Sequence, residues 1–200
     1  MILAGLTGNI GSGKTTVSRL FSMLGVPVYC ADEKGRQFLG LAEVKEKVVS
    51  LFGGRVLNEE GMIDRKKLAS VVFADKGKLR QLNEVIHPMV RADFRKWADK
   101  HEGHPYVIEE VAILFESGLA RDFDKIVLVA APEDIRINRV CKRDGVEADS
   151  VRQRARHQWS EEKKIPLSDF IINNDGNSLV IDQVTEVHEQ LLKAAGVSGQ

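Results

Sequence analysis

Short apolar runs, separated by longer segments with helical spacing, dominate the hydrophobic pattern of this 200-residue chain. No hairpin turn joins one run to the next, and the intervening segments are long enough for helices. Because strands that alternate with helices favour a parallel sheet, the pattern predicts a three-layer α/β fold with a five-stranded parallel sheet. The five predicted strands are residues 2–6, 27–31, 106–111, 125–131 and 169–172.

A long helical insertion is predicted between the second and third strands, where more than seventy residues intervene. Apolar positions such as Val44 and Val48 recur at helical rather than alternating spacing. A longer helical series runs over residues 79–97, and Pro88 within it is expected to kink the helix or to mark a boundary. The insertion is therefore predicted to be helical throughout.

A glycine-rich motif, Gly-x-x-x-x-Gly-Lys-Thr, stands between the first strand and an amphipathic helix. In this context the backbone N–H groups of the loop surround phosphate oxygens at the positive end of the helix. A chance glycine-rich turn is the alternative, and the strand and helix on either side favour the phosphate loop. We expect Lys14 to bridge the terminal phosphates and Thr15 to coordinate Mg²⁺. The predicted nucleotide-binding residues of the loop are Asn9, Ile10, Gly11, Ser12, Gly13, Lys14, Thr15 and Thr16.

The phosphate loop predicts nucleotide binding but leaves the reaction open. There is no Asn-Lys-x-Asp sequence for guanine recognition and no strand ending in Asp followed by the machinery of a motor ATPase, so the GTPase and transporter interpretations lose support. An early phosphate loop, a helical insertion and a later basic segment are typical of a small-molecule kinase, which must exclude water from ATP. We therefore assign residues 1–31, 104–135 and 167–200 to a P-loop NTPase-like core, 32–103 to an acceptor-binding domain and 136–166 to a lid.

The overall charge is balanced, with 29 basic and 29 acidic residues, which does not favour a protein that coats nucleic acid or an anionic membrane. Locally, residues 136–164 contain nine basic and five acidic side chains. Arg136, Arg139 and Arg143 have the spacing of one helix face. Such a face is usually only solvated, but after a phosphate loop it suits a lid, and we expect Arg139 and Arg143, and also Arg154, to contact the nucleotide.

The two cysteines, Cys30 and Cys141, have neither metal nor redox spacing, which is typical of a reducing compartment. The first residues lack a basic segment, and their apolar run is too short to cross a bilayer. We therefore expect a cytoplasmic protein without a membrane or nucleic-acid partner. A monomer is expected, with an oligomer as the alternative.

Short motifs beyond the phosphate loop extend over nearly the whole chain. They are Ala31-Asp32, Gly61, Asp64-Arg65 with Leu68, Val72-Phe73, Ile86-His87-Pro88, Leu114-Phe115-Glu116, Arg139, Arg143, Arg154, Gln158 and the segment from Asp169 through Ile172 to Asn174. In order and spacing the set resembles the dephospho-CoA kinase family. The resemblance implies ATP-dependent phosphorylation of the ribose 3′-hydroxyl of dephospho-CoA, the last step of coenzyme A synthesis, with Mg²⁺ as cofactor.

Two segments depart from the family pattern, and in the one that begins at Glu110 the usual proline is also lost, with Ala112 in its place. The family usually has Asp-Ala-Asp after the second strand, and this chain has Cys30-Ala31-Asp32. The resemblance makes Asp32 the general base and an acceptor-binding residue, and a helix N-cap is the alternative role. Glu110 stands where the family usually has Asp, and it is expected to order a Mg²⁺-bound water. Cys30 is interpreted as a packing residue.

The remaining candidates each keep two interpretations. Arg65 binds an acceptor phosphate or is solvated, His87 contacts the acceptor or caps a kinked helix, and Asn174 shapes the adenine pocket or forms a turn. Glu116 is an acceptor-binding candidate by resemblance, and the catalytic set is Asp32, Lys14 and Arg139.

Two rival functions also remain. One is a kinase acting on another small acceptor such as a nucleoside monophosphate, and the other is a nucleotide sensor without turnover.

Overall fold

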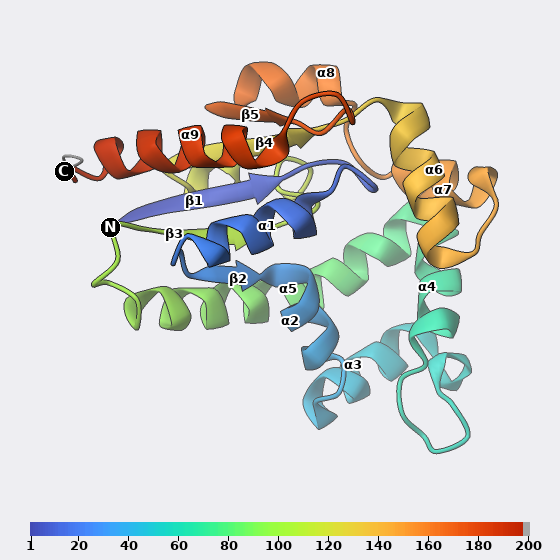
Figure 1. The fold of residues 1–200 in the computed structure, drawn as a ribbon. Helices are drawn as coiled ribbons and strands as arrows, with labels where there is room; N and C mark the ends of the chain where they lie inside the picture. The colour runs from blue at the N-terminus through green and yellow to red at the C-terminus, as the bar shows by residue number, and fades with distance from the viewer. Residues whose placement is uncertain (198–200) are drawn as a thin grey trace. The chain divides into compact units, whose positions relative to one another are not determined.

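The computed structural model describes residues 1–197, apart from the side chain of Lys76. Its centre is a single five-stranded sheet in the order β2-β3-β1-β4-β5, with every pairing parallel (Figure 1). The strands are β1 Ile2–Thr7, β2 Val28–Cys30, β3 Tyr106–Glu110, β4 Lys125–Ala130 and β5 Phe170–Asn173. The predicted five-stranded parallel sheet is confirmed, with strand ends that differ by at most one residue.

α-Helices connect successive strands, as the sequence pattern predicts, except between β3 and β4, where the chain forms turns and a short 3₁₀ helix. They are α1 Lys14–Met23, α2 Ala31–Phe38, α3 Ala42–Phe52, α4 Arg65–Phe73, α5 Lys76–Asp99, α6 Glu133–Asp144, α7 Ala148–Ala155, α8 Glu161–Lys164 and α9 Val180–Ala194. Short 3₁₀ turns lie at Gly54–Val56, Leu119–Asp122 and Ile165–Leu167. The basic segment is therefore helical over α6, α7 and α8.

The chain divides into two compact units. One contains residues 1–30 together with the chain from residue 98 onward, and it holds the sheet and α6 to α9. The other contains residues 31–97, and it holds α2, α3, α4 and most of α5. The last three residues of the predicted core, 198–200, lie outside the described residues.

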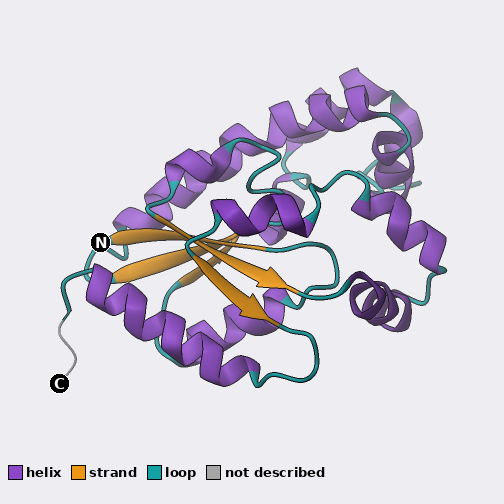
Figure 2. Cartoon of the chain, turned by 90° about the horizontal axis from the view of Figure 1, so that it is seen from above, coloured by secondary structure: helices purple, strands orange, loops and turns teal. Residues whose placement is uncertain are grey.

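The core of the sheet-containing unit lies between the sheet and two helices. Val17 and Phe21 of α1 and Val184 and Leu191 of α9 are fully buried in one apolar cluster with side chains of β1, β3, β4 and β5. Figure 2 shows the strands of the sheet side by side, in orange. Burial of the strands on both sides explains why their sequences are continuously apolar rather than alternating.

The helical unit has its own buried positions at the helical spacing seen in the sequence, such as Val44 and Val48 of α3 and Leu68 and Val72 of α4. Its longest helix, α5, continues through Pro88. The helix boundary that was one of the two predictions for Pro88 is therefore absent. Pro88 is exposed, so the backbone carbonyl that loses its hydrogen-bond donor can be solvated by water.

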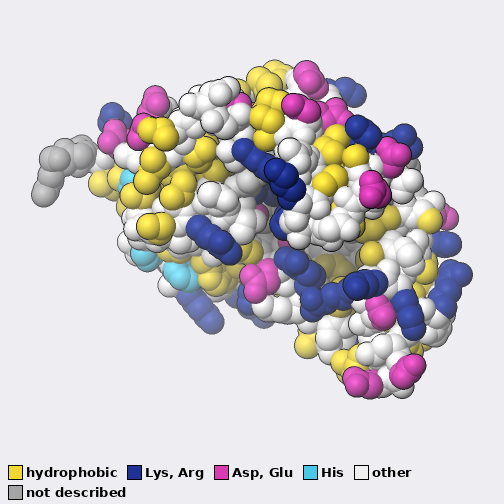
Figure 3. Space-filling model, turned by 45° about the vertical axis from the view of Figure 1, so that its right-hand side comes forward, with side chains coloured by type: hydrophobic (Ala, Val, Ile, Leu, Met, Phe, Trp, Pro, Cys, Tyr) yellow, Lys and Arg dark blue, Asp and Glu magenta, His cyan; other side chains and the backbone are white. Residues whose placement is uncertain are grey.

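Charged side chains of both signs occur on the face shown in Figure 3. Within residues 1–197 no helix combines the length and apolar character needed to span a membrane.

Candidate active site

The phosphate loop occupies the turn between β1 and α1 and is closely packed. Gly11 and Gly13 have φ angles of 81° and 98°, which L side chains rarely adopt. A Cβ atom at Gly11 would collide with the backbone carbonyl of Arg136, and one at Gly13 with the side-chain amide of Asn174. The glycines are thus required by backbone conformation and by the residues that pack against the loop. The positive end of α1 begins directly after them.

Two predicted nucleotide-binding residues, Lys14 and Thr15, open helix α1. The Lys14 Nζ donates a hydrogen bond to the carbonyl of Gly8 at 2.9 Å, so its ammonium group lies over the loop. The Thr15 hydroxyl donates to Oε1 of Glu110 at 3.4 Å. The other carboxylate oxygen of Glu110 accepts a weak bond from the Cys30 thiol at 3.7 Å. The structure therefore brings together the two oxygen-bearing residues predicted for the metal site.

These groups fit a Mg²⁺ ion that arrives with a nucleotide. Hydroxyl and carboxylate oxygens are ligands that Mg²⁺ prefers, directly or through water. Thr15 and Glu110 supply the hydroxyl and the carboxylate at the loop. Glu110 ends β3 and is 9% exposed, which suits a carboxylate that orders a bound water rather than one solvated freely.

Arg139 and Asn174 join the basic segment to the phosphate loop. Asn174 follows β5, and its amide nitrogen donates to the carbonyl of Ser12 at 2.8 Å. The amide oxygen accepts a bond from Arg139 Nη2 at 3.1 Å. Arg139 and Asn174 therefore lie beside the loop, as their prediction as nucleotide-binding residues requires. Asn174 is more than an ordinary turn residue, because its side chain is used to fix the loop.

The other arginines of the predicted lid face differ from Arg139. Arg136 is buried, and its Nε donates to the carbonyl of Ala131 at 2.8 Å, so it braces the start of its own helix. Arg143 and Arg154 both bind Asp144, at 2.7 and 3.1 Å. The hydrogen bond from Arg143 lowers the pKa of the Asp144 carboxyl, and the same bond raises the pKa of Arg143. Shared helical spacing therefore did not give these arginines a shared role.

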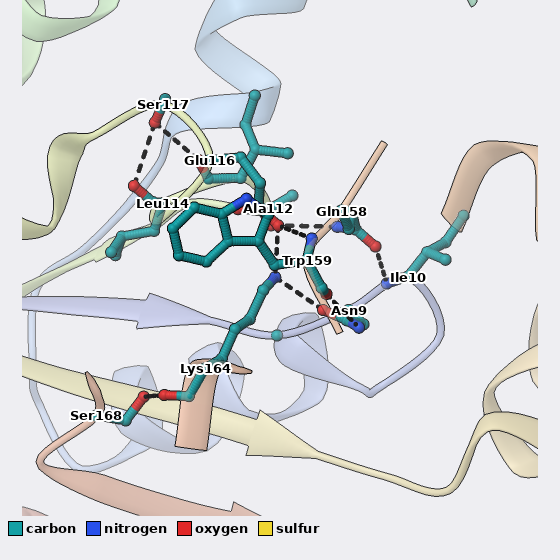
Figure 4. Close-up of polar contacts among 12 residues, drawn as sticks. Asn9, Ile10, Ala112, Leu114, Glu116, Ser117, Gln158, Trp159, Lys164 and Ser168 are labelled. Atoms are coloured by element: carbon teal, nitrogen blue, oxygen red, sulfur yellow. Dashed lines mark hydrogen bonds and ion pairs between the residues drawn. The ribbon is translucent and has the colours of Figure 1, made fainter. Parts of the chain in front are cut away.

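A buried polar cluster that sequence reasoning missed lies behind the loop (Figure 4). Glu116, predicted to bind the acceptor, instead accepts bonds at Oε1 from the backbone N–H of Trp159 and from the ammonium group of Lys164, at 2.6 and 2.9 Å. Lys164 also donates to the Asn9 side chain at 2.8 Å. Gln158, noted only as a family motif, accepts a bond from the Ile10 N–H at 2.8 Å. No local pattern marks Lys164, because only the fold brings it to the loop.

In the helical unit, Asp32 occupies the first turn of α2, where a carboxylate interacts favourably with the helix dipole. Its side chain is exposed. His87 lies inside α5 rather than at an end, so the interpretation of His87 as a helix cap is wrong. Burial lowers the pKa of the His87 imidazole, and the nearby positive charge of Arg91 adds to this shift.

Arg65 begins α4, and Asp64 is the N-cap of that helix, with its carboxylate accepting bonds from the N–H groups of Lys66 and Lys67. Arg65 and Arg36 line a pocket of about 190 Å³ in this unit. The remaining lining residues are Gln37, Leu39, Gly40, Met62 and Ile63. A pocket of this size, with two guanidinium groups, suits one anionic part of a larger ligand.

A parallel sheet with a phosphate loop after β1, an acid at the end of β3 and an arginine on α6 beside the loop defines a P-loop small-molecule kinase. A sequence profile of the dephospho-CoA kinase family matches residues 2–179. The chain belongs to this family.

Individual relatives agree with the family profile. The chain is 38% identical over 186 residues to a dephospho-CoA kinase of Bacteroides fragilis, covering 93% of this chain and 91% of that protein. It is 38% identical over 191 residues to one of Aquifex aeolicus, covering 94% and 97%. Among solved structures, a Thermus thermophilus protein matches with a TM-score of 0.83 at 33% identity, covering 99% of this chain and 98% of that one. The dephospho-CoA kinase of Campylobacter jejuni matches with a TM-score of 0.68 at 26% identity, covering 96% and 98%.

Proposed function

We propose that this chain transfers the γ-phosphoryl group of ATP to the ribose 3′-hydroxyl of dephospho-CoA, giving coenzyme A and ADP, with Mg²⁺ as cofactor. The observation that carries the proposal is the phosphate loop with Lys14 and Thr15 at its end, in a chain that belongs to the dephospho-CoA kinase family. A cytoplasmic location, a monomeric state and the absence of nucleic-acid or membrane partners stay predictions.

The loop and its neighbours have separate tasks in this reaction. The N–H groups of the loop and the positive end of α1 bind phosphate oxygens, and Lys14 neutralises the terminal phosphates. Thr15 would hold the Mg²⁺ ion, and Glu110 would orient one of its waters. When bound, the ion would supply positive charge against the negative charge that moves from the γ-phosphate to the leaving oxygen.

Asp32 is the proposed general base. It stands two residues beyond the end of β2, and its side chain is exposed, so a substrate hydroxyl can reach its carboxylate. In this role Asp32 orients the ribose 3′-hydroxyl in line with the γ-phosphorus and accepts its proton during transfer. Its position in the first turn of α2 places the carboxylate at the positive end of the helix dipole.

The acceptor is proposed to bind through its own anionic groups. Arg65 and Arg36 line one pocket, which supports the assignment of Arg65 to an acceptor phosphate. His87, which burial favours in the neutral form, is proposed to contact the acceptor as a hydrogen-bonding group rather than as a cation. The role of Glu116 toward the acceptor stays a prediction, because its contacts in the structure are internal.

Arg139 is proposed to stabilise the phosphoryl group during transfer. Arg143 is proposed to make a second contact with the nucleotide. Arg139 is held beside the loop through Asn174, whereas Arg143 is paired with Asp144. A guanidinium group that is fixed in place before the reaction stabilises developing charge without a further cost of reorganisation. The geometry therefore favours Arg139 for the catalytic role.

A coupled assay of ADP formation tests the proposal with three mixtures. These contain dephospho-CoA, a panel of nucleoside monophosphates, or no acceptor. ADP formation that depends on dephospho-CoA and on Mg²⁺ is expected. Turnover only with a monophosphate would overturn the acceptor assignment, and ATP binding without any turnover would identify a nucleotide sensor.

A further inference from the structure

The side chain of Lys164, the last residue of α8, has no exposed surface. A buried ammonium group is unfavourable unless it is paired and hydrogen-bonded. Two partners meet this requirement, since Nζ lies 2.9 Å from Oε1 of Glu116 and donates to Oδ1 of Asn9 at 2.8 Å. One of these partners is a counter-charge and the other belongs to the phosphate loop. Lys164 thus connects the loop to a carboxylate outside it.

The side-chain amide of Asn9 is fixed at both ends. Its oxygen accepts the bond from Lys164, and its nitrogen donates to the backbone carbonyl of Trp159 at 3.1 Å. The backbone N–H of Trp159 in turn donates to the same carboxylate oxygen of Glu116 that pairs with Lys164. Asn9 is 5% exposed, so the two contacts of its own amide are largely sheltered from water. Only one orientation of this amide satisfies both partners.

The next residue of the loop is held by the same segment. The backbone N–H of Ile10 donates to the side-chain oxygen of Gln158 at 2.8 Å, and the nitrogen of Gln158 donates to the carbonyl of Ala112 at 3.1 Å. Figure 4 shows these contacts around Lys164 and Glu116. Two consecutive loop residues are therefore attached to residues 158–164, and these are attached to residues 112–116.

A glycine-rich loop has a particular need for such attachments. Glycines allow the tight turns that phosphate binding requires, but they also leave the empty loop many other conformations. Ordering the loop at the moment of binding would reduce affinity, whereas a loop that is ordered beforehand binds more tightly. A buried ion pair adds little stability compared with apolar packing, but it can favour one arrangement over others. The contacts of Lys164 are therefore better explained by loop geometry than by stability.

We propose that Lys164 is a positioning residue for ATP, which holds the Asn9–Ile10 turn of the phosphate loop in its binding shape, with Glu116 as counter-charge. The inference rests on the proposed function, because it takes the ligand of the loop to be ATP. It adds a role for α8, whose contribution lies behind the loop rather than over the substrates. Lys164 acts through Asn9 and is not assigned a contact with ATP.

The test compares Lys164→Met with Lys163→Met, a matched control on the same helix whose side chain is exposed. The dissociation constant of ATP and the KM values of both substrates are measured on chains whose folding has been checked by circular dichroism. For Lys164→Met we expect ATP to bind about tenfold or more weakly, by analogy with other second-layer contacts, while the KM of dephospho-CoA stays near that of the wild type. The Lys163→Met chain should match the wild type, and Lys164→Arg should recover much of the affinity.

A second variant separates loop positioning from loss of folding, because Lys164→Met leaves the buried Glu116 carboxylate without its cation. The double variant Lys164→Met with Glu116→Gln removes both charges, and it should fold while still binding ATP weakly. ATP affinity equal to that of the wild type in this folded chain would overturn the inference, as would equal weakening of both substrates in Lys164→Met alone. A wild-type chain that binds no ATP would overturn the proposed function, and this inference with it.

The indole of Trp159 offers an independent signal. It stacks on Phe115, with ring centroids 6.3 Å apart, and its backbone contacts Asn9 and Glu116. In a Trp97→Phe background, Trp159 is the remaining tryptophan of the chain. We expect its emission to change when ATP binds, and the change to be diminished in Lys164→Met at saturating ATP. An unaltered emission change would contradict a positioning role.

Discussion

Arg139 of α6 donates a hydrogen bond from Nη2 to the side-chain oxygen of Asn174 at 3.1 Å. Asn174 also binds the carbonyl of Ser12, so the guanidinium group is connected to the phosphate loop through a single side chain. Its Nη1 is buried, and no hydrogen-bond partner for it occurs among residues 1–197. A buried donor without a partner is unfavourable, and an anionic ligand at the loop would satisfy it.

Replacing Arg139 by Ala should lower kcat by about 10²- to 10³-fold, the range observed when one preorganised donor to a transition state is lost. Arg139→Lys should recover only part of the rate, because an ammonium group lacks the planar fork of guanidinium. Steady-state kinetics with ATP and dephospho-CoA provide the measurement. Arg152→Ala is a suitable control, since Arg152 is exposed and pairs only locally with Asp149. A normal kcat in Arg139→Ala would exclude Arg139 from the chemical step.

Replacing Asp32 by Asn should slow transfer by about 10²- to 10⁴-fold, the usual contribution of a general base. ATP affinity should change little, because the amide keeps the size of the side chain and the phosphate loop is untouched. Glu33→Gln removes a neighbouring charge from the same first turn of α2 and serves as the control. Single-turnover measurements with prebound ATP report the chemical step directly. If Asp32→Asn and Glu33→Gln were equally active, Asp32 would not be the base.

The strands and the phosphate loop were predictable from the sequence because their signals are local. A continuous apolar run such as residues 125–131 reports burial on both faces of a sheet, and the loop is defined by residues that are adjacent in the chain. The helix start after Pro132 was equally clear. In contrast, the contacts of Lys164 join residues separated by 48 and 155 positions, so no sequence window contains them.

The arginines show a second limit of sequence reasoning. Helical spacing correctly placed Arg136, Arg139 and Arg143 on one helix, but the three side chains have different partners. Arg136 is buried against the start of α6, whereas Arg143 pairs with Asp144. The position of a residue along a helix limits the direction of its side chain, but its neighbours from other elements decide its contacts.

Replacing Thr15 by Val should raise the Mg²⁺ concentration needed for half-maximal activity, because the hydroxyl is lost while the shape is kept. Thr15→Ser keeps the hydroxyl and should stay close to the wild type. Glu110→Gln should give a similar shift of about 10- to 100-fold, as for other residues that orient metal ligands. Activity is measured over a Mg²⁺ titration at saturating ATP. The same Mg²⁺ requirement in Thr15→Val and the wild type would exclude Thr15 as a ligand.

The lowered pKa of His87 predicts a pH-dependent stability. Burial, aided by Arg91, favours the neutral imidazole in the folded state, so unfolding takes up a proton as the pH falls below about 6.5. The stability contributed by neutral His87 is complete above that pH and is lost as the pH falls toward the lower folded pKa. Urea unfolding at about pH 8 and about pH 5.5 should show a smaller difference for His87→Gln than for the wild type. His104→Gln is the exposed control, and an equal pH dependence in His87→Gln would refute the prediction.

Alanine substitutions at Gly11 and Gly25 distinguish the destabilisation caused by backbone strain from that caused by a steric clash. Their φ angles are nearly equal, 81° and 80°, so an alanine at either position must adopt a left-handed conformation. A Cβ atom at Gly25 would meet no heavy atom within 4 Å, whereas at Gly11 it would collide with the carbonyl of Arg136. The two substitutions are therefore matched in strain and differ in contact.

Gly25→Ala should lower the free energy of unfolding by about 1–2 kcal/mol, the cost of the left-handed conformation, and leave the KM of ATP unchanged. Gly11→Ala should lower it further and also raise the KM of ATP, because the loop or α6 must move to make room for the methyl group. Urea unfolding and ATP kinetics on both variants give the comparison. If Gly11→Ala behaved like Gly25→Ala in both measurements, α6 would not hold the loop in place. Arg139 belongs to the same helix as Arg136, so a shift of α6 in Gly11→Ala could also displace its guanidinium group. If Gly11→Ala weakens ATP binding but leaves kcat unchanged, the packing of Gly11 against α6 positions the loop and not the Arg139 guanidinium group.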